Sequence, residues 1–371
     1  MNYVLHYLHP TVKWLEGIFI FTLVVTFDSN AQTFWEIEQR EVLVPLAASE
    51  ELKDSIIQGG QPNVSGRKSL VPVTLSEWKK TIGFRKKNKR FNTSALIDKF
   101  NVKMNEDEIN GVPIFVITPL NESPRFNDKV MLYLHGGGYV FNAGEQGVLE
   151  GVVIAGSTGV PVVVVDYRMP PESPFPAALD DVVAVYTHLL KNKSSQKIAI
   201  GGTSAGGGLA LATVQKLKKN KLPLPALIYA GTPWSDLSKT GDTLSTNEGI
   251  DRVLVTYDGF LSGAAKLYAG GYEIKHPGIS PVYGDFTDFP PTYLVTGTRD
   301  LLLSDTVRIH RKLREAGVEA DLNVYEGLSH GGYLVALSSP ESRQVYLEMT
   351  GFMRRHFVNS EARQQKGYEN E

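Results

Sequence analysis

The feature that most constrains this chain is a glycine-rich turn, Gly201–Gly208, which contains the sequence Gly-Thr-Ser-Ala-Gly. It follows the short strand-like run Lys197–Ile200 and opens a helical pattern. A Gly-x-Ser-x-Gly sequence between a strand and a helix is typical of a nucleophile elbow, a turn so tight that the serine hydroxyl stands clear of the sheet. The residues two before and two after the serine must be almost free of side chain, and Gly202 and Gly206 meet this need. Ser204 is therefore a candidate nucleophile.

The same glycines could instead belong to a nucleotide-binding loop. A dinucleotide-binding loop needs Gly-x-Gly-x-x-Gly. Position 203 is Thr, however, and the pair Gly206 and Gly208 is followed by Leu211 where a third glycine is needed. A P-loop needs Lys after its glycines, and no Lys follows either this run or the earlier run Gly136–Gly138. Both nucleotide-binding alternatives fail, which leaves a glycine turn without chemistry as the alternative to the elbow.

The size and charge of the chain restrict its partners. Its 371 residues, with a formal net charge of −2, suit one large α/β domain with an added lobe. Such a balance gives no general attraction to nucleic acid or to anionic membranes. The basic cluster at 85–90 has no aromatic residue within it, and we expect a solvated loop there. We expect a small-molecule substrate and no nucleic-acid partner.

The N-terminus has the pattern of an export signal. Lys13 precedes an apolar run at 17–27, and the small residues Ser29 and Ala31 stand where a signal peptidase reads. Residues 1–31 are predicted to be a signal peptide, which places the mature protein in the periplasm or outside the cell without a stable membrane span. An uncleaved signal anchor is the alternative. The sequence contains no cysteine, so folding needs no oxidation.

Strand-like and helical patterns alternate from about residue 100 onward, which predicts an α/β fold with a mostly parallel, doubly wound sheet. The apolar run Val130–Leu134 suits a strand buried on both faces. The other expected strands are Phe100–Met104, Val112–Thr118, Val160–Val165, Lys197–Ile200, Leu227–Ala230, Thr292–Val295 and Leu322–Tyr325. The expected helices between them are Ala177–Leu190, Ala205–Lys219, Val307–Ala316 and Ser342–His356.

The remaining segments are assigned around that core. The core itself comprises residues 96–233 and 285–358. Residues 32–95 are predicted to form N-terminal cap helices. The insertion 234–284 follows a strand at its carboxyl end, where ligands bind in open α/β sheets, and is predicted to be a second cap segment. Residues 359–371 form a polar tail.

A second glycine run supplies the partner that an elbow requires. His135 precedes Gly136–Gly138, directly after an expected strand. A His-Gly-Gly-Gly loop is a known source of oxyanion-hole donors, because consecutive glycines leave the backbone N–H groups unobstructed. The expected donors are the N–H groups of Gly136, Gly137 and Ala205. A flexible glycine turn is the alternative, and His135 itself is expected to order the loop by hydrogen bonding.

The base and the acid are found by their positions along the chain. His330 follows the last strand, where a loop can aim an imidazole at Ser204, and a structural histidine is the alternative. The seven other histidines lie in the predicted signal, the helices, the cap or the glycine loop: His6, His9, His135, His188, His276, His310 and His356. Asp300 ends a strand turn and is favoured as the acid over Asp305, which begins a helix.

These motifs together resemble the bacterial hormone-sensitive lipase-like family of carboxylesterases, and the likeness covers nearly the whole chain after the predicted signal. The segments Asp166–Arg168 and Thr232–Leu237 match that family as well. Thr203 makes the chain similar to the Gly-Thr-Ser-Ala-Gly-Gly subgroup. The resemblance implies an α/β-hydrolase fold, a cap that forms the acyl pocket, short-to-medium acyl esters, no cofactor and a monomer or homodimer. No metal is expected, and Asp166 and Arg168 are expected to form a structural ion pair.

The predicted activity is ester hydrolysis by a Ser204–His330–Asp300 triad through an acyl-enzyme. The residues expected near the substrate are Tyr139, Phe141, Phe260 and Leu261, although core packing explains each of them equally well. The alternatives are a non-catalytic ligand-binding protein of the same fold, an esterase with lactonase or amidase activity, and a peptidase. The complete triad favours an enzyme.

Overall fold

The computed structural model describes residues 41–368 apart from positions 70, 89–90, 122 and 127, with side chains described up to residue 357. The predicted signal peptide and residues 32–40 of the predicted cap lie outside the described residues. The chain divides into two compact units, Met1–Val42 and Leu43–Glu371. The fold described below is that of the second unit.

In the described part of the chain, eight strands form one sheet in the order β1-β2-β4-β3-β5-β6-β7-β8. β1 and β2 pair antiparallel, β2 and β4 pair antiparallel, and all later pairs are parallel. The strands are β1 (Val102–Ile109), β2 (Val112–Pro119), β3 (Val130–Leu134), β4 (Val162–Val165), β5 (Ile198–Thr203), β6 (Leu227–Gly231), β7 (Thr292–Gly297) and β8 (Ala320–Tyr325). The prediction of a mostly parallel, doubly wound sheet is confirmed.

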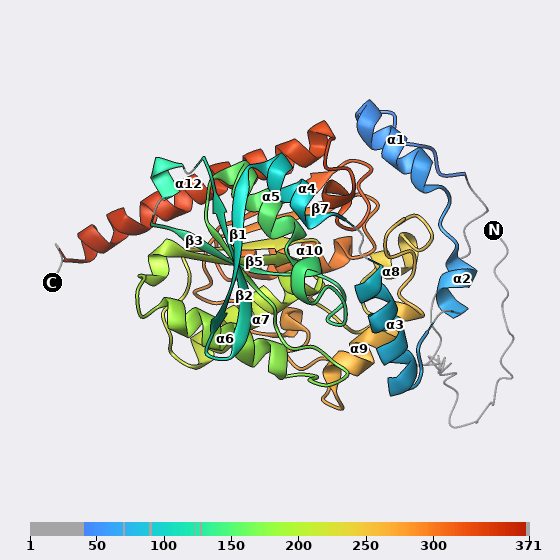
Figure 1. The fold of residues 1–371 in the computed structure, drawn as a ribbon, viewed down its shortest axis with the longest axis horizontal. Helices are drawn as coiled ribbons and strands as arrows, with labels where there is room; N and C mark the ends of the chain where they lie inside the picture. The colour runs from blue at the N-terminus through green and yellow to red at the C-terminus, as the bar shows by residue number, and fades with distance from the viewer. Residues whose placement is uncertain (1–40, 70, 89–90, 122, 127, 369–371) are drawn as a thin grey trace, which may run out of the picture. The chain divides into compact units, whose positions relative to one another are not determined.

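Helices cover both faces of this sheet (Figure 1). The helices of the described part of the chain are α1 (Glu50–Gly59), α2 (Val64–Ser69), α3 (Leu75–Lys87), α4 (Thr93–Phe100), α5 (Leu149–Thr158), α6 (Ala177–Leu189), α7 (Ala205–Lys219), α8 (Thr243–Thr246), α9 (Phe260–Ala269), α10 (Leu303–Glu315), α11 (Gly332–Val335) and α12 (Pro340–Tyr368). Helices α6, α7 and α10 bury one core against the sheet, and α5 and α12 bury another. The side chains of β3 alternate between the two cores, as the period of two in a strand requires.

Helix α5, between β3 and β4, is not among the helices that the sequence analysis names. Most residues of this helix are apolar, and even its acidic residue, Glu150, is buried, as is Val153. The helix therefore has no polar face that would create a helical periodicity in the sequence. Gly151 and Gly156 also weaken the pattern. They are needed for packing, since a Cβ on Gly156 would lie 2.3 Å from the carbonyl oxygen of Phe100.

The N-terminal segment of the unit is helical, as expected. Helix α3 begins with a capping box, in which Thr74 and Glu77 bond to each other's backbone N–H groups. The predicted cap boundary at residue 95 falls within α4, which packs on α5 and β1. Phe100, expected to begin a strand, ends α4 instead, and Asn101 in the left-handed conformation separates it from β1. None of the described helices is both long and apolar enough to cross a membrane.

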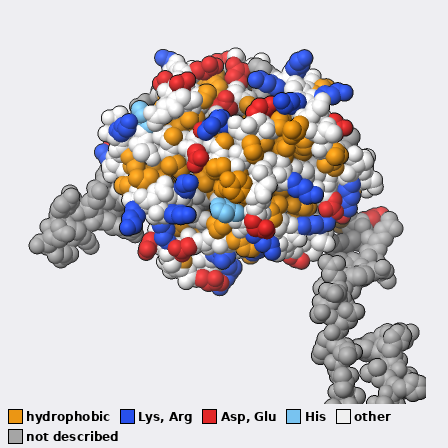
Figure 2. All heavy atoms as spheres, turned by 90° about the horizontal axis from the view of Figure 1, so that it is seen from below, with side chains coloured by type: hydrophobic (Ala, Val, Ile, Leu, Met, Phe, Trp, Pro, Cys, Tyr) orange, Lys and Arg blue, Asp and Glu red, His pale blue; other side chains and the backbone are white. Residues whose placement is uncertain are grey.

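The two segments predicted to form the cap are in contact. Helix α3 of the first segment lies beside α9 of the second (Figure 1). The rings of Trp78 and Phe260 are 5.6 Å apart. Basic and acidic side chains are interspersed on the face that Figure 2 shows, as the near-neutral net charge leads one to expect.

The packing of the elbow predicts that Gly202→Ala destabilises the fold. A Cβ at this position would lie 2.2 Å from the carbonyl oxygen of Leu134 and 2.6 Å from the carbonyl carbon of Gly206. Because these are backbone atoms, the strands must shift to make room. We expect the free energy of unfolding to fall by about 1–3 kcal/mol or more. Gly351→Ala is the control, since its Cβ would meet nothing within 4 Å in helix α12. The free energy of unfolding of Gly351→Ala should rise by about 0.5–1 kcal/mol, because alanine loses less backbone entropy in a helix than glycine does. Equal denaturant midpoints for the two variants would contradict this account of the elbow.

Candidate active site

Ser204 lies between β5 and α7 in a backbone conformation that L-residues rarely adopt, with φ 61° and ψ −123°. The turn holds because two glycines allow strand and helix to approach the end of β3. A Cβ on Gly206 would lie 1.9 Å from the carbonyl oxygen of Leu134, and Gly202 is similarly restricted. The Ser204 N–H donates to the carbonyl of Gly231, 2.8 Å away, which fixes the turn to β6. The sequence motif thus forms the predicted elbow.

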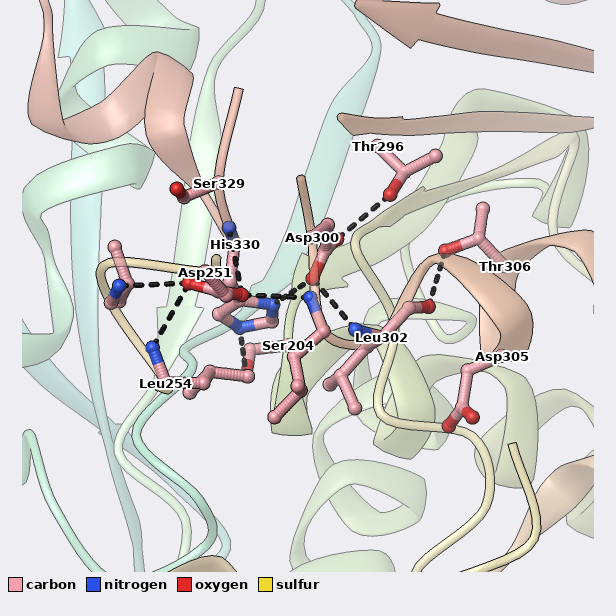
Figure 3. A network of polar contacts seen from close by, with 12 residues as sticks. Ser204, Asp251, Leu254, Thr296, Asp300, Leu302, Asp305, Thr306, Ser329 and His330 are labelled. Carbon is pink, nitrogen blue, oxygen red and sulfur yellow. Dashed lines mark hydrogen bonds and ion pairs between the residues drawn. The ribbon is translucent and has the colours of Figure 1, made fainter. Parts of the chain in front are cut away.

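Three residues predicted from separate parts of the sequence meet at this turn (Figure 3). The Nε2 atom of His330 is 2.8 Å from the Oγ of Ser204. Its Nδ1 atom is 3.0 Å from Oδ1 of Asp300. These two distances give the imidazole one hydrogen bond on each side, so a proton on Nδ1 leaves Nε2 free to accept from the serine hydroxyl.

Asp300 is itself oriented by the structure around it. Its side chain is fully buried, in the loop after β7. The hydroxyl of Thr296 donates to Oδ2 over 2.7 Å, and the N–H of Leu302 donates to Oδ1 over 2.8 Å. The carboxylate therefore cannot rotate freely, and it presents one oxygen to His330.

Asp305, the second candidate acid, has a different position. It lies in the first turn of α10 and accepts hydrogen bonds from the N–H groups of Ser235 and Asp236 at 2.9 and 2.8 Å. Burial raises its pKa to about 8. Asp300, and not Asp305, is thus the carboxylate that bonds to His330.

The pKa of His330 is shifted by two opposing effects. Burial, the larger single effect, favours the neutral ring and lowers the pKa. The negative charge of Asp300 and its hydrogen bond favour the imidazolium, and the charge of Asp251 adds to them. Together the carboxylates outweigh burial, so the pKa of His330 lies above its ordinary value of 6.5.

The glycine loop after β3 lies against the elbow. A Cβ on Gly136 would be 3.3 Å from the Cβ of Ser204. Among the described residues, the N–H groups of Gly136 and Gly137 donate no hydrogen bond, and the N–H of Ala205 begins α7, where a helix has no internal acceptor. The glycine loop thus lies beside Ser204, and the part of these three N–H groups as oxyanion donors stays a prediction.

Side chains on the outer side hold this loop in place. The carbonyl of Gly136 accepts from the Nδ2 of Asn142 at 3.0 Å, and the Nδ1 of His135 is 2.9 Å from the same oxygen. The ring of His135 stacks on Tyr167 at 4.2 Å, and the Tyr167 hydroxyl donates to the His135 carbonyl. His135 thus orders the loop and does not bond to Ser204.

A buried polar network that the sequence did not predict lies behind the elbow. The hydroxyl of Thr203 is 2.9 Å from that of Tyr229 and 3.0 Å from that of Tyr333. Tyr229 and Tyr133 each donate to the carboxylate of Glu150, at 2.6 and 2.5 Å. Burial raises the pKa of Glu150. The only sequence signal was an acidic residue within an apolar stretch.

A cavity of about 580 Å³ opens onto Ser204 and His330. Three of the four predicted pocket residues line it: Phe141, Phe260 and Leu261. Tyr139 does not line it, because its ring stacks on Tyr268 at 3.8 Å and is 1% exposed. The rings of Phe141 and Phe260 stack at 4.9 Å and form part of the wall.

One further expectation concerns a pair of charged groups. The predicted ion pair between Asp166 and Arg168 is wrong, since the Arg168 guanidinium bonds to Asp181 at 2.6 Å, while Asp166 accepts from the N–H of Gly144. Arg168 and Asp181 come together because helix α6 folds back on the loop after β4. Among the described residues, no group of three or more His, Cys, Asp or Glu side chains could hold a metal ion.

Comparison with known proteins gives a consistent result. A family described as having the alpha/beta hydrolase fold matches residues 131–334. An acetyl-hydrolase of Streptomyces hygroscopicus is 32% identical over 231 residues, which cover 62% of this chain and 77% of that protein. An ethyl acetate hydrolase of Pseudomonas putida is 28% identical, over 59% of this chain and 70% of that protein.

Solved structures extend the likeness over a larger share of the chain. Esterase E25 superposes with a TM-score of 0.85 and 46% identity, covering 87% of this chain and 99% of that one. An esterase from the bacterial hormone-sensitive lipase family superposes with a TM-score of 0.70 and 30% identity, covering 84% of this chain and all of that one.

The fold and the matches define a carboxylic ester hydrolase of the α/β-hydrolase class. Within that class, the chain belongs to the bacterial hormone-sensitive lipase-like family. The resemblance inferred from the motifs is confirmed at the level of the family.

The surroundings of His330 predict that its imidazole titrates above pH 6.5, whereas His310, whose pKa is lowered by burial, titrates below. Because protonated His330 is favoured in the fold, it stabilises the protein fully below pH 6.5, and this contribution is lost as pH rises through the folded pKa. Histidine ring resonances in NMR spectra measure both values. In Asp300→Asn the His330 pKa should fall, and an unchanged value would contradict the part assigned to Asp300.

Proposed function

We propose that the protein is a serine carboxylesterase in which Ser204 is the nucleophile, His330 the general base and Asp300 the residue that orients His330. The observation that carries this proposal is the continuous chain of two hydrogen bonds from Ser204 to His330 to Asp300, with the glycine loop directly beside the serine. Geometry of this kind defines the triad on unrelated folds, independently of sequence position.

In the first step, Ser204 Oγ attacks the ester carbonyl carbon while Nε2 of His330 accepts the hydroxyl proton. The carbonyl oxygen becomes an anion, and the N–H groups of Gly136, Gly137 and Ala205 are positioned to donate to it. The bond to the alcohol oxygen then breaks, His330 returns the proton to the leaving alcohol, and an acyl ester remains on Ser204.

The second step repeats this chemistry with water. His330 accepts a proton from a water molecule, whose oxygen attacks the acyl carbon, and the same donors stabilise the second anion. When the bond to Ser204 breaks, His330 returns the proton to the serine oxygen and the carboxylic acid leaves. The carboxylate of Asp300 orients the imidazole and stabilises the imidazolium at both stages.

The cavity supports short-to-medium acyl esters as substrates. Its wall near Ser204 contains the apolar side chains of Phe141, Phe260 and Leu261, which suit an acyl chain and offer it no charge. Related enzymes include one named for ethyl acetate, which is a short ester. Lactones and amides have a carbonyl carbon that the same nucleophile can attack, so they are tested as substrates together with the esters.

Replacing Ser204 by Ala should lower kcat/KM for p-nitrophenyl acetate by about 10³-fold or more, because the variant lacks the hydroxyl that forms the acyl-enzyme. Ser262→Ala, on cap helix α9, is the control. Among the described residues, the hydroxyl of Ser262 bonds to Gly259 alone, and Ser262 does not line the cavity, so activity should be retained. A Ser204→Ala variant that hydrolyses the ester near the wild-type rate would show that the activity arises elsewhere. A wild-type protein that hydrolyses no ester, lactone or amide would favour a binding role.

The aromatic wall of the cavity predicts a limit on acyl length. In a series of p-nitrophenyl esters from acetate to palmitate, kcat/KM should fall sharply beyond a medium chain. Phe260→Ala should move this fall to longer chains, because it removes a ring from the wall beside Gly138. Phe289→Ala is the matched control: this buried ring does not line the cavity. It should leave the limit unchanged, and an equal shift in both variants would contradict this assignment of the wall.

A further inference from the structure

A second buried carboxylate lies beside the triad and is not used by the mechanism above. Asp251 belongs to the second cap segment, in the loop between α8 and α9, and its side chain is fully buried. Figure 3 shows it between the chain segments that carry Asp300 and His330. Burying an ionisable group costs free energy unless other groups bond to it, so the bonding partners of Asp251 indicate its role.

The carboxylate of Asp251 bonds only to backbone N–H groups among the described residues. Its Oδ2 atom accepts from the N–H of Leu301 at 2.7 Å and from the N–H of His330 at 3.3 Å. Its Oδ1 atom accepts from Val253 at 2.8 Å and Leu254 at 3.1 Å, which closes a turn in its own loop. One side chain thus joins the cap to two separate loops of the core.

These two core loops are the ones that must stay aligned for catalysis. Leu301 follows Asp300 directly, in the loop after β7, and His330 lies in the loop after β8. Apart from the cap, the two loops are joined by the imidazole–carboxylate contact of 3.0 Å and by two hydrogen bonds further along: the N–H of Arg299 donates to the carbonyl of Leu328 at 3.1 Å, and the N–H of Gly327 donates to the hydroxyl of Thr298 at 2.9 Å. The bond from Asp251 to each backbone fixes the distance between them from the other side.

Neighbouring residues of the same cap loop strengthen the connection. The Nδ2 of Asn247 donates to the carbonyl of Asp300 at 2.8 Å, and the N–H of Arg252 donates to Oγ of Ser329 at 3.2 Å. These bonds add contacts to both loops but bring no further negative charge. A mutation of Asn247 therefore removes contacts to the core loops without removing a charge, whereas a mutation of Asp251 removes both.

The charge of Asp251 acts on His330 as well. The charged groups that surround Asp251 are Asp300 and His330 from the core loops and Arg252 from its own loop. Two more charges act on these neighbours: Arg299 lowers the pKa of Arg252, and Asp305 raises that of His330. Burial and the charge of Asp300 raise the pKa of Asp251, while His330 lowers it. An imidazolium at position 330 thus favours the ionised form of Asp251, and the ionised form in turn favours the imidazolium.

We propose that Asp251 is a positioning residue of the esterase, which aligns the loops carrying Asp300 and His330 and supplies a second negative charge that stabilises the imidazolium during acyl transfer. The cap is then part of the catalytic arrangement as well as the wall of the substrate cavity. This inference rests on the proposed triad, because without His330 as base the charge would have no catalytic effect.

The test compares the pH profiles of kcat for wild type, Asp251→Asn and Asn247→Ala with p-nitrophenyl acetate. Asp251→Asn should lower kcat by about 10- to 100-fold, with KM changed much less, and should move the acid limb to lower pH, since one carboxylate no longer favours the imidazolium. Asn247→Ala removes backbone contacts without removing charge. It should lower the unfolding temperature and leave the acid limb in place.

An acid limb at the same pH in wild type and Asp251→Asn would overturn the proposal and make Asp251 a structural residue alone. If Asp251→Asn does not fold, Asp251→Ser replaces it, because a serine hydroxyl can close the turn to Val253 and Leu254 without a charge. The same limb shift is then required. Ser204→Ala separates the two hypotheses: if it stays active the triad itself is wrong, and if it is inactive only the role of Asp251 is under test.

Discussion

The arrangement of the site depends on one close approach, that of the elbow backbone to the carbonyl oxygen of Leu134 at the end of β3. Cβ atoms on Gly202 and Gly206 would lie 2.2 and 1.9 Å from this oxygen, so only glycines allow it. The approach has two consequences. It forces Ser204 into its positive φ, and it places the glycine loop that follows Leu134 directly beside the serine.

The remaining groups converge because parallel strands end at one edge of the sheet. β5, β7 and β8 run parallel, and the loops that follow them carry Ser204, Asp300 and His330. The segment 234–284, predicted to be the second cap segment, contributes Phe260 and Leu261 to the cavity wall. Through Asp251 it also bonds to the two loops that carry Asp300 and His330. Burial alone would make His330 a weak base, and the buried carboxylates reverse that effect.

The features that the sequence revealed are those encoded in short segments. The elbow, the glycine loop and the positions of Asp300 and His330 after strands all depend on neighbouring residues, and the structure brings them together. The alternation of strands and helices predicted the sheet for the same reason. Helix α5 was missed because a helix with so few polar residues has no periodic polar face.

Features that depend on distant partners could not be found in this way. Asp251 lies in an irregular loop, and its proposed role depends on its hydrogen bonds to the distant residues Leu301 and His330. Arg168 has Asp166 two residues away but bonds to Asp181, because the path of the chain after β4 decides the partner. Tyr139 follows the glycine loop directly, yet stacking on Tyr268 turns it away from the cavity.

The central claim is that Ser204 attacks the substrate while the glycine loop and α7 stabilise the resulting anion. A crystal structure of the protein after reaction with a fluorophosphonate ester tests it most directly, because the bound phosphonyl group resembles the tetrahedral intermediate. The account predicts phosphorus on Ser204 Oγ, with one phosphonyl oxygen at about 2.7–3.1 Å from the backbone nitrogens of Gly136, Gly137 and Ala205. Phosphorus on another residue, or an oxygen directed away from these three nitrogens, would contradict it.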